Sequence, residues 1–145
     1  MADPDSLAIV FKRALAQHLE DAGCGVYRSD GTAYLATERG IYTNGPDLPT
    51  AAGTDNCLIL TWLSPVPDGR ANMLYRVQVL SRLKGSRIAA DNWAALIAKA
   101  LDQKQNTPPG HSIAWTELFS ELAYTADTSG RASTAQTFTF LGRRQ

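Results

Sequence analysis

The chain has 145 residues, of which 44% are hydrophobic and 19% charged, a composition typical of one folded globular domain spanning 1–145. Fourteen basic and fourteen acidic side chains cancel, so no strong overall field attracts nucleic acid or an anionic membrane. Cys24 and Cys57 are too few for a disulfide framework and too far apart for a C-x-x-C site, and we expect reduced thiols. The N-terminal segment carries charges through its apolar stretch, unlike a signal peptide or membrane anchor, which favours a cytoplasmic protein.

An amphipathic helix is predicted over residues 6–22. Ser6 is the expected N-cap, Asp3 and Asp5 suit the positive end of the helix dipole, and Gly23 ends the helix. The apolar stripe consists of Leu7, Phe11, Leu15, Leu19 and Ala22. Ile9 lies off this stripe, which indicates either an ordinary exposed residue or a subunit contact.

Short strands and a long loop follow the first helix. Glycine-containing turns separate the β-like pieces 26–28, 33–36 and 41–42. Residues 43–56 have no periodicity and are rich in glycine and proline, so they form a loop of unusual length for a compact domain. Loops of this length are often functional.

Two strands are predicted in the middle of the chain. Residues 57–63 are apolar on both alternating faces, as in a central strand that is buried on both sides. Residues 73–83 alternate between apolar and polar, as in a long strand with one face in water. The turn-rich segment between them indicates a hairpin.

A second helix is predicted over residues 87–103, and β-like runs follow at 111–119, 121–127 and 135–141. The helical stripe is Ala89, Trp93, Leu96, Ile97, Ala100 and Leu101. The order of elements predicts an α+β fold, with a mixed, mostly antiparallel sheet and two main helices. The predicted core contains Trp62, Leu60, Val77, Val79, Phe11, Leu15, Trp93, Leu96, Ile97 and Phe138.

No catalytic or cofactor-binding pattern emerges from the residues. His18 lies beside the apolar stripe of the first helix and indicates a packing or surface role, whereas His111 is expected in a solvated turn. Neither histidine is near a cysteine at metal-ligand spacing, and the sequence has no phosphate-binding glycine loop. We therefore expect a protein that is not an enzyme and that uses no metal or cofactor.

Charge is unevenly distributed along the chain. Residues 1–69 carry four basic and nine acidic side chains, and residues 70–104 carry seven basic and two acidic ones. Arg76 and Arg82 share one face of the predicted strand 73–83, with Arg87 close behind, and this face is either solvated or a protein contact. One hypothesis is that Arg82 and Arg87 meet acidic residues of the next subunit. The acidic candidates are Asp21, Glu38 and Asp55. The alternative is that the two segments neutralise each other within one subunit.

The order of elements from Ser6 to Arg144 resembles the tail terminator, or minor tail, family of long-tailed bacteriophages. The resemblance covers nearly the whole chain and is carried by three segments. They are LAIVFKRALAQHLEDAGCGVY, the strand MLYRVQVLSRLKG running into the helix AADNWAALIAKAL, and the closing DTSGRASTAQTFTFLGRR. Sequences in this family carry no catalytic motif, so the resemblance lies in architecture and length.

The resemblance implies a structural virion protein that forms a ring, expected to be a hexamer. The ring would cap the tail tube, stop its polymerisation and join the tail to the head connector or stopper protein. DNA would pass through the lumen without specific binding, and assembly in the host cytoplasm would place the protein in the virion tail. Ring closure uses two different patches on each subunit. The candidate interface residues are Asp47 and Leu48 in the loop 43–56, with Arg76, Arg82, Arg87, Arg143 and Arg144.

Two other classes remain open. A head-to-tail stopper or tail completion protein would have the same size and composition, and the sequence does not separate it from a terminator. A small-molecule binding module or an enzyme would need a pocket, for example beside Trp62 or Trp115, although tryptophans of this kind most often pack in the core.

Overall fold

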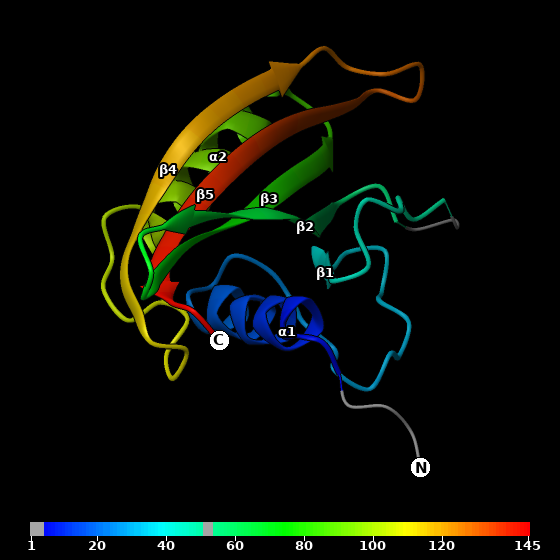
Figure 1. Ribbon diagram of the computed structural model, residues 1–145. Helices are drawn as coiled ribbons and strands as arrows, with labels where there is room; N and C mark the ends of the chain where they lie inside the picture. Colours follow the sequence, from blue (N-terminus) through cyan, green and yellow to red (C-terminus); the bar gives the residue numbers. More distant parts are fainter. Residues whose placement is uncertain (1–4, 51–53) are drawn as a thin grey trace.

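A five-stranded sheet and two helices make up the described part of the chain, residues 5–50 and 54–145 of this computed structural model (Figure 1). Asp3 and residues 51–53 of the predicted loop lie outside the described residues. The elements are α1 (Leu7–Asp21), β1 (Gly40–Tyr42), β2 (Cys57–Asp68), β3 (Asn72–Lys84), α2 (Arg87–Leu101), β4 (Ile113–Tyr124) and β5 (Arg131–Arg143). The spatial order is β1-β2-β3-β5-β4, with β1 parallel to β2 and the other neighbours antiparallel. The predicted α+β fold, its mostly antiparallel mixed sheet and its central hairpin are confirmed.

Helix α1 begins and ends where its sequence signals indicate. The Ser6 hydroxyl accepts a hydrogen bond from the Ile9 amide at 3.4 Å, which satisfies one of the free donors of the first turn. The helix ends at Asp21, and Gly23 has a φ of 81°, the left-handed conformation that favours glycine. The amides of Gly23 and Cys24 then donate back to the carbonyls of the last turn.

Helix α2 differs from its prediction in length and in orientation. It ends at Leu101 instead of 103, and Gln103 has a left-handed φ of 57°. Its buried side is formed by Ala90, Trp93, Ala94, Ile97 and Leu101. Leu96 is 40% exposed, so its prediction as a core residue is wrong. One residue corresponds to about 100° of rotation around a helix, and burial of Ile97 therefore turns Leu96 towards solvent.

Several strand boundaries also differ from the prediction. The runs 111–119 and 121–127 form the single strand β4, with an irregularity between Leu118 and Ser120 that interrupts the side-chain alternation. Strand β2 continues to Asp68 through a similar irregularity between Leu63 and Val66. Of the pieces predicted in 25–42, only Gly40–Tyr42 forms a strand, joined by a single bridge to Val26. The predicted strand 33–36 is wrong.

The two faces of the sheet have different environments. One face carries Tyr75, Val77 and Val79 of β3, paired with Phe140, Phe138 and Gln136 of β5, and packs against both helices. Phe11 of α1 contacts Phe140 with ring centroids 5.0 Å apart. We call this the helix face. The other face carries Arg76, Gln78, Leu80 and Arg82 of β3, and we call it the outer face.

Most of the predicted core is confirmed. Phe11, Leu15, Leu60, Val77, Val79, Trp93, Ile97 and Phe138 are buried. Trp62 is only half-buried and packs edge-on against Phe11, with ring centroids 5.6 Å apart. His111 also stacks edge-on against Phe11, at 5.7 Å, so this histidine is partly packed and is not the solvated loop residue expected.

Candidate docking site

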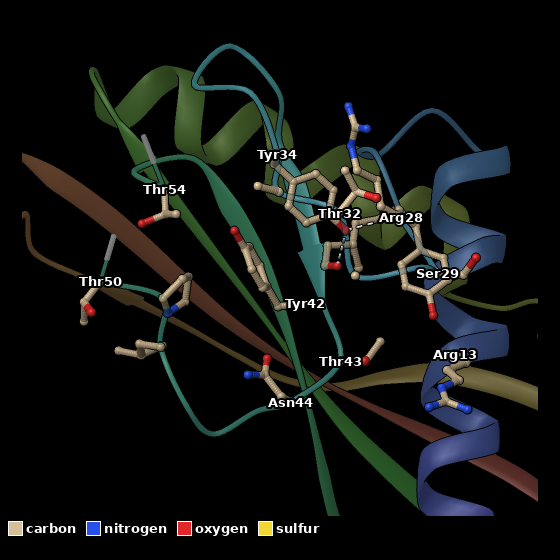
Figure 2. Close-up of a pocket in the computed structure, with 16 residues that line it drawn as sticks. Arg13, Arg28, Ser29, Thr32, Tyr34, Tyr42, Thr43, Asn44, Thr50 and Thr54 are labelled. Atoms are coloured by element: carbon tan, nitrogen blue, oxygen red, sulfur yellow. Dashed lines mark hydrogen bonds between the residues drawn. The ribbon is translucent and has the colours of Figure 1, made fainter. Parts of the chain in front are cut away.

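An open cleft of about 630 Å³ lies between the irregular segment 27–34 and the residues 43–50 and 54, with β1 between them (Figure 2). Tyr42 projects into it from the end of β1, and Thr50 and Thr54 lie on the wall opposite Ser29 and Arg13 (Figure 2). The remaining lining residues are Tyr27, Arg28, Gly31, Thr32, Ala33, Tyr34, Ile41, Thr43, Asn44, Leu48 and Pro49. Among the described residues, the lining is therefore aromatic and polar, with two arginines and no carboxylate.

The inner wall is organised by Glu38. Its carboxylate accepts two hydrogen bonds from Arg28 Nη2, at 2.8 and 3.1 Å, and a third from the Leu35 amide at 2.7 Å. The Tyr34 hydroxyl accepts from the Arg28 amide at 3.0 Å and donates to the Ile41 carbonyl at 2.8 Å. These contacts tie an irregular segment to β1 by polar groups, which explains how it keeps its shape without strand pairing.

The same contacts change the acid–base properties of the inner wall. The Leu35 amide and the Arg28 guanidinium hold the pKa of Glu38 below its usual range, because both stabilise the ionised carboxylate. Burial raises the pKa of the Tyr34 phenol. Hydrogen bonds from Thr32 lower the pKa of Asp30. All three groups therefore keep their ordinary charge near neutral pH.

The outer wall, formed by the described residues 43–50 and Thr54, is held by hydrogen bonds at Gly45, Pro49 and Thr54. The Gly45 amide donates to the Leu60 carbonyl at 3.2 Å. A Cβ at position 45 would lie 2.6 Å from that oxygen, so only glycine permits this close approach to β2. At the other end, Arg82 Nη2 donates to the Pro49 carbonyl at 2.9 Å and to the Thr54 carbonyl at 2.7 Å.

Arg82 is an internal residue of the subunit. Only 5% of it is exposed, so of the two alternatives for this face, solvated or a protein contact, the solvated one does not hold for Arg82. The physical reason is that the loop folds back over this end of the outer face and supplies the carbonyls that a buried guanidinium needs. Its neighbour across the strands is Cys57, where burial raises the pKa of the thiol and the Arg82 charge partly offsets that rise.

The other predicted interface residues occupy separate parts of the molecule. Asp47 and Leu48 are exposed in the loop 43–56, and Leu48 lines the cleft. Arg76 donates to the Ser64 carbonyl on the outer face, at 2.9 Å from Nη2. Arg87 binds Asp91 and reaches the Thr134 hydroxyl at 2.6 Å. Arg143 and Arg144 are exposed at the far end of β5, where Arg144 Nη2 donates to the Gly69 carbonyl at 3.1 Å.

Ion pairs within the subunit use several of the charges proposed for subunit contacts. Glu38 pairs with Arg28, and Arg87 pairs with Asp91. Asp55 lies 3.8 Å from Arg131, at the limit of an ion pair. Of the three acidic candidates, Asp21 accepts a hydrogen bond from Gln17. Each described ion pair lies within segment 1–69, lies within segment 70–104, or involves Arg131. None of them therefore joins the acidic segment 1–69 to the basic segment 70–104.

Sequence reasoning identified the outer wall of the cleft but missed its inner wall. The inner wall contains Tyr27, Arg28 and Tyr34, in a segment that we interpreted as strand fragments. The available signal was composition, because tyrosines among Ser, Thr, Asp and Gly are typical of recognition loops. Periodicity carried no such signal.

The remaining chemistry-bearing residues are internal. His18 Nε2 lies 3.3 Å from the Ala100 carbonyl, between the two helices. Cys24 and Cys57 are buried free thiols, and burial raises the pKa of Cys24 to about 11. Within residues 5–50 and 54–145, no group of three or more His, Cys, Asp or Glu side chains is placed to hold a metal ion. None of the described helices is both long and apolar enough to cross a membrane.

Comparison with solved structures shows a likeness in fold. No protein-family model matches the chain, and no curated protein sequence matches it significantly. Among solved structures, the fold is similar to a chain of the virion of a native gene transfer agent particle, with a TM-score of 0.60 and 14% sequence identity. The likeness covers 96% of this chain and 100% of the other. With an identity of 14%, the likeness shows that the two chains share a fold over nearly their whole length.

Proposed function

We propose that this chain is a structural protein of a phage-like virion, and that its role is that of a tail terminator. The observation that supports the proposal best is the fold shared over 96% of this chain with a component of a gene transfer agent virion. The sequence resemblance to tail terminators adds the particular role. In this role the subunits form a ring, expected to contain six copies, that caps the tail tube, stops its polymerisation and joins the tail to the head connector.

The architecture suits a protein that works through its surfaces. The sheet and the helix face form a rigid body, whereas the cleft and the distal part of the β4–β5 hairpin are exposed. The hairpin projects away from the body of the molecule (Figure 1). Exposed loops on a rigid scaffold are common contact elements, and a closed ring needs two different patches on each subunit. The proposed partners are other copies of the chain, the tail tube protein, and the connector or stopper protein.

The net charge of the chain bears on the proposed passage of DNA through the ring. A formal net charge of zero fits a lumen through which DNA slides without being held by a dense array of cations. The protein would assemble in the host cytoplasm and remain in the virion tail. This role requires no catalytic group, metal or cofactor, and we propose that the chain is not an enzyme.

The proposal is tested by assembling tubes from the tail tube protein of the same virus with and without this chain. We expect electron micrographs to show added density at one tube end, six-fold averages of that density, and shorter tubes as the chain concentration rises. Tubes of unchanged length with bare ends would contradict the terminator role. Binding to purified connector without binding to tubes would instead identify a stopper or tail completion protein.

A further inference from the structure

Exposed apolar side chains occupy two opposite sides of the subunit, one beside β4 and the other beside β1. We propose that these two sides form one heterologous contact, in which a second copy of this chain packs its β1 side against the β4 side of the first. The inference rests on the ring that the proposed function requires. It deepens that function, because it assigns the contact between subunits to two defined surfaces.

The first surface is built on the second half of β4, which is an edge strand of the sheet. The chain itself covers the first half of this edge. There, Lys104 and Thr116 exchange backbone hydrogen bonds of 3.2 and 2.8 Å, and the Asp102 carboxylate accepts a hydrogen bond from the Leu118 amide. Among the described hydrogen bonds, none joins residues 119–123 to a segment other than β5. This part of the edge is therefore open to another chain.

Apolar side chains line the open part of the edge. Phe119 is 68% exposed, Leu122 56% and Tyr124 48%, although all three belong to one strand. Phe119 has no partner in β5, because the register shifts between Leu118 and Ser120, and a bulge at a sheet edge commonly re-aims a side chain. Large apolar side chains this close together are typical of a contact surface.

Helix α2 extends the same surface. A groove of about 360 Å³ lies between α2 and the second half of β4, and its lining includes the small side chains of Ala95, Ala98 and Ala123. Ile88 is 74% exposed and precedes Ala95 by two helical turns, so it lies on the same side of α2. We call residues 119–124, together with the adjoining side of α2, the β4 surface.

The carboxylates of this groove already have partners within the subunit. Asp91 binds Arg87 at 2.7 Å, and Glu121 accepts a hydrogen bond of 2.8 Å from Gln136 Nε2. The β4 surface therefore offers a partner mainly apolar area. A contact stabilised by burial of that area should depend little on salt, because salt screens charges and not apolar burial.

The second surface lies at the opposite edge of the sheet, beside β1 (Figure 1). Its segments border one cleft, because Arg13 of α1, Ala33 and Leu48 all line it. Leu35, in the segment before β1, is 63% exposed. We call this side the β1 surface, and its exposed large apolar side chains are Ile9, Val10, Leu35 and Leu48.

The distribution of these side chains selects a second copy as the partner. Apart from Val66 and Leu96, every exposed large apolar side chain of the described residues belongs to one of the two surfaces. A two-fold contact joins like surfaces and would leave the other surface of each copy exposed, whereas a heterologous contact covers both. Surfaces at opposite edges of the sheet give each copy one neighbour on either side, which is the arrangement of a closed ring.

A single charge placed on each surface tests the contact. Phe119→Asp alters the β4 surface, Leu35→Asp alters the β1 surface, and Leu96→Asp is a matched control at an exposed apolar residue outside both. We expect the first two variants to raise the concentration needed for assembly by tenfold or more, measured by analytical ultracentrifugation, and the control to leave it unchanged. Circular dichroism and thermal unfolding should show folded subunits, because the altered side chains are exposed. Val10→Asp repeats the test of the β1 surface on α1, away from the segment that Glu38 holds.

A mixture of the two variants distinguishes a heterologous contact from a two-fold one. Phe119→Asp keeps an intact β1 surface and Leu35→Asp keeps an intact β4 surface, so the mixture can form one undamaged contact and no second one. We expect complexes of twice the subunit mass at concentrations where each variant alone is a monomer. With a two-fold contact through either surface, one variant would assemble by itself and the mixture would form nothing new.

The outcomes separate this inference from the proposed function. A parent that assembles into rings but caps no tube keeps the contact and removes the terminator role. A parent that caps tubes, with Phe119→Asp and Leu35→Asp assembling as readily as the parent, keeps the role and overturns the inference. If Phe119→Asp assembles normally but no longer binds tube ends, the β4 surface belongs to the tube contact, which also overturns the inference. A parent that stays a single subunit at every concentration, with and without tubes, overturns both.

Discussion

The two faces of β3 make different kinds of contact and have different structural roles. On the helix face, Tyr75, Val77 and Val79 are buried by apolar packing. On the outer face, Arg76 donates to the Ser64 carbonyl at the irregularity in β2, and Arg82 donates to the Pro49 and Thr54 carbonyls of the loop. Apolar burial is strong but nondirectional, whereas a guanidinium fixes the position of a particular oxygen. The comparison indicates that one strand supports the core with one face and positions the irregular loop 43–56 with the other.

The largest effect is expected at the helix face. Leu60→Ala removes a fully buried side chain and should lower the free energy of unfolding by about 2–5 kcal/mol, as for other core leucines. The matched control is Leu96→Ala, where the side chain is 40% exposed and the loss should be under about 1 kcal/mol. Urea unfolding followed by circular dichroism measures both. Equal losses in the two variants would contradict the orientation of α2.

A smaller but clear loss of stability is expected for Trp93→Phe, which tests a polar contact within the helix face. The Trp93 indole donates to the Cys24 carbonyl at 2.8 Å, and phenylalanine would leave that carbonyl without its donor. We expect a loss of about 1–3 kcal/mol, because a buried acceptor becomes unsatisfied and ring volume is lost. Tm and urea midpoints provide the measurement. An unchanged midpoint would show that another donor replaces the indole.

A substitution on the outer face should change the free energy of unfolding only slightly. Arg76→Met removes hydrogen bonds from a partly exposed guanidinium to the Ser64 carbonyl, and the expected loss is under about 1 kcal/mol. The same urea series as for Leu60→Ala measures this loss. If Arg76→Met cost as much as Leu60→Ala, the contrast between the two faces would disappear.

The smallest effect is local and depends on pH. The pKa of Glu38 is held below its ordinary value, so its contacts stabilise the inner wall at pH values above that ordinary value and are lost as the pH falls through the lowered pKa. We therefore expect the Leu35 amide signal in NMR spectra to stay constant down to the ordinary glutamate range and to shift only in stronger acid. In Glu38→Gln this transition should be absent. A Leu35 shift in the parent already complete at the ordinary glutamate pKa would refute the tight contact.

Local sequence signals determined much of the fold. Ser6 and Gly23 marked the ends of α1, because capping depends on a few neighbouring residues. The alternation in 73–83 correctly placed Val77 and Val79 in the core, because side chains on a strand repeat every second residue. The class of fold, the central hairpin and most of the core follow from such local patterns.

Tertiary structure decided the features in which distant segments meet. The orientation of α2 depends on where Trp93 and Ile97 find apolar partners in the rest of the fold. Because both pack into the core, Leu96 faces solvent. The alternation of its strand left Arg82 either solvated or in a protein contact, and it is buried because the segment carrying the Pro49 and Thr54 carbonyls folds over it. The inner wall of the cleft depends on the contacts of Glu38 with Arg28 and Leu35. Such contacts join residues that no periodic pattern in the sequence relates to one another, so only the folded chain brings them together.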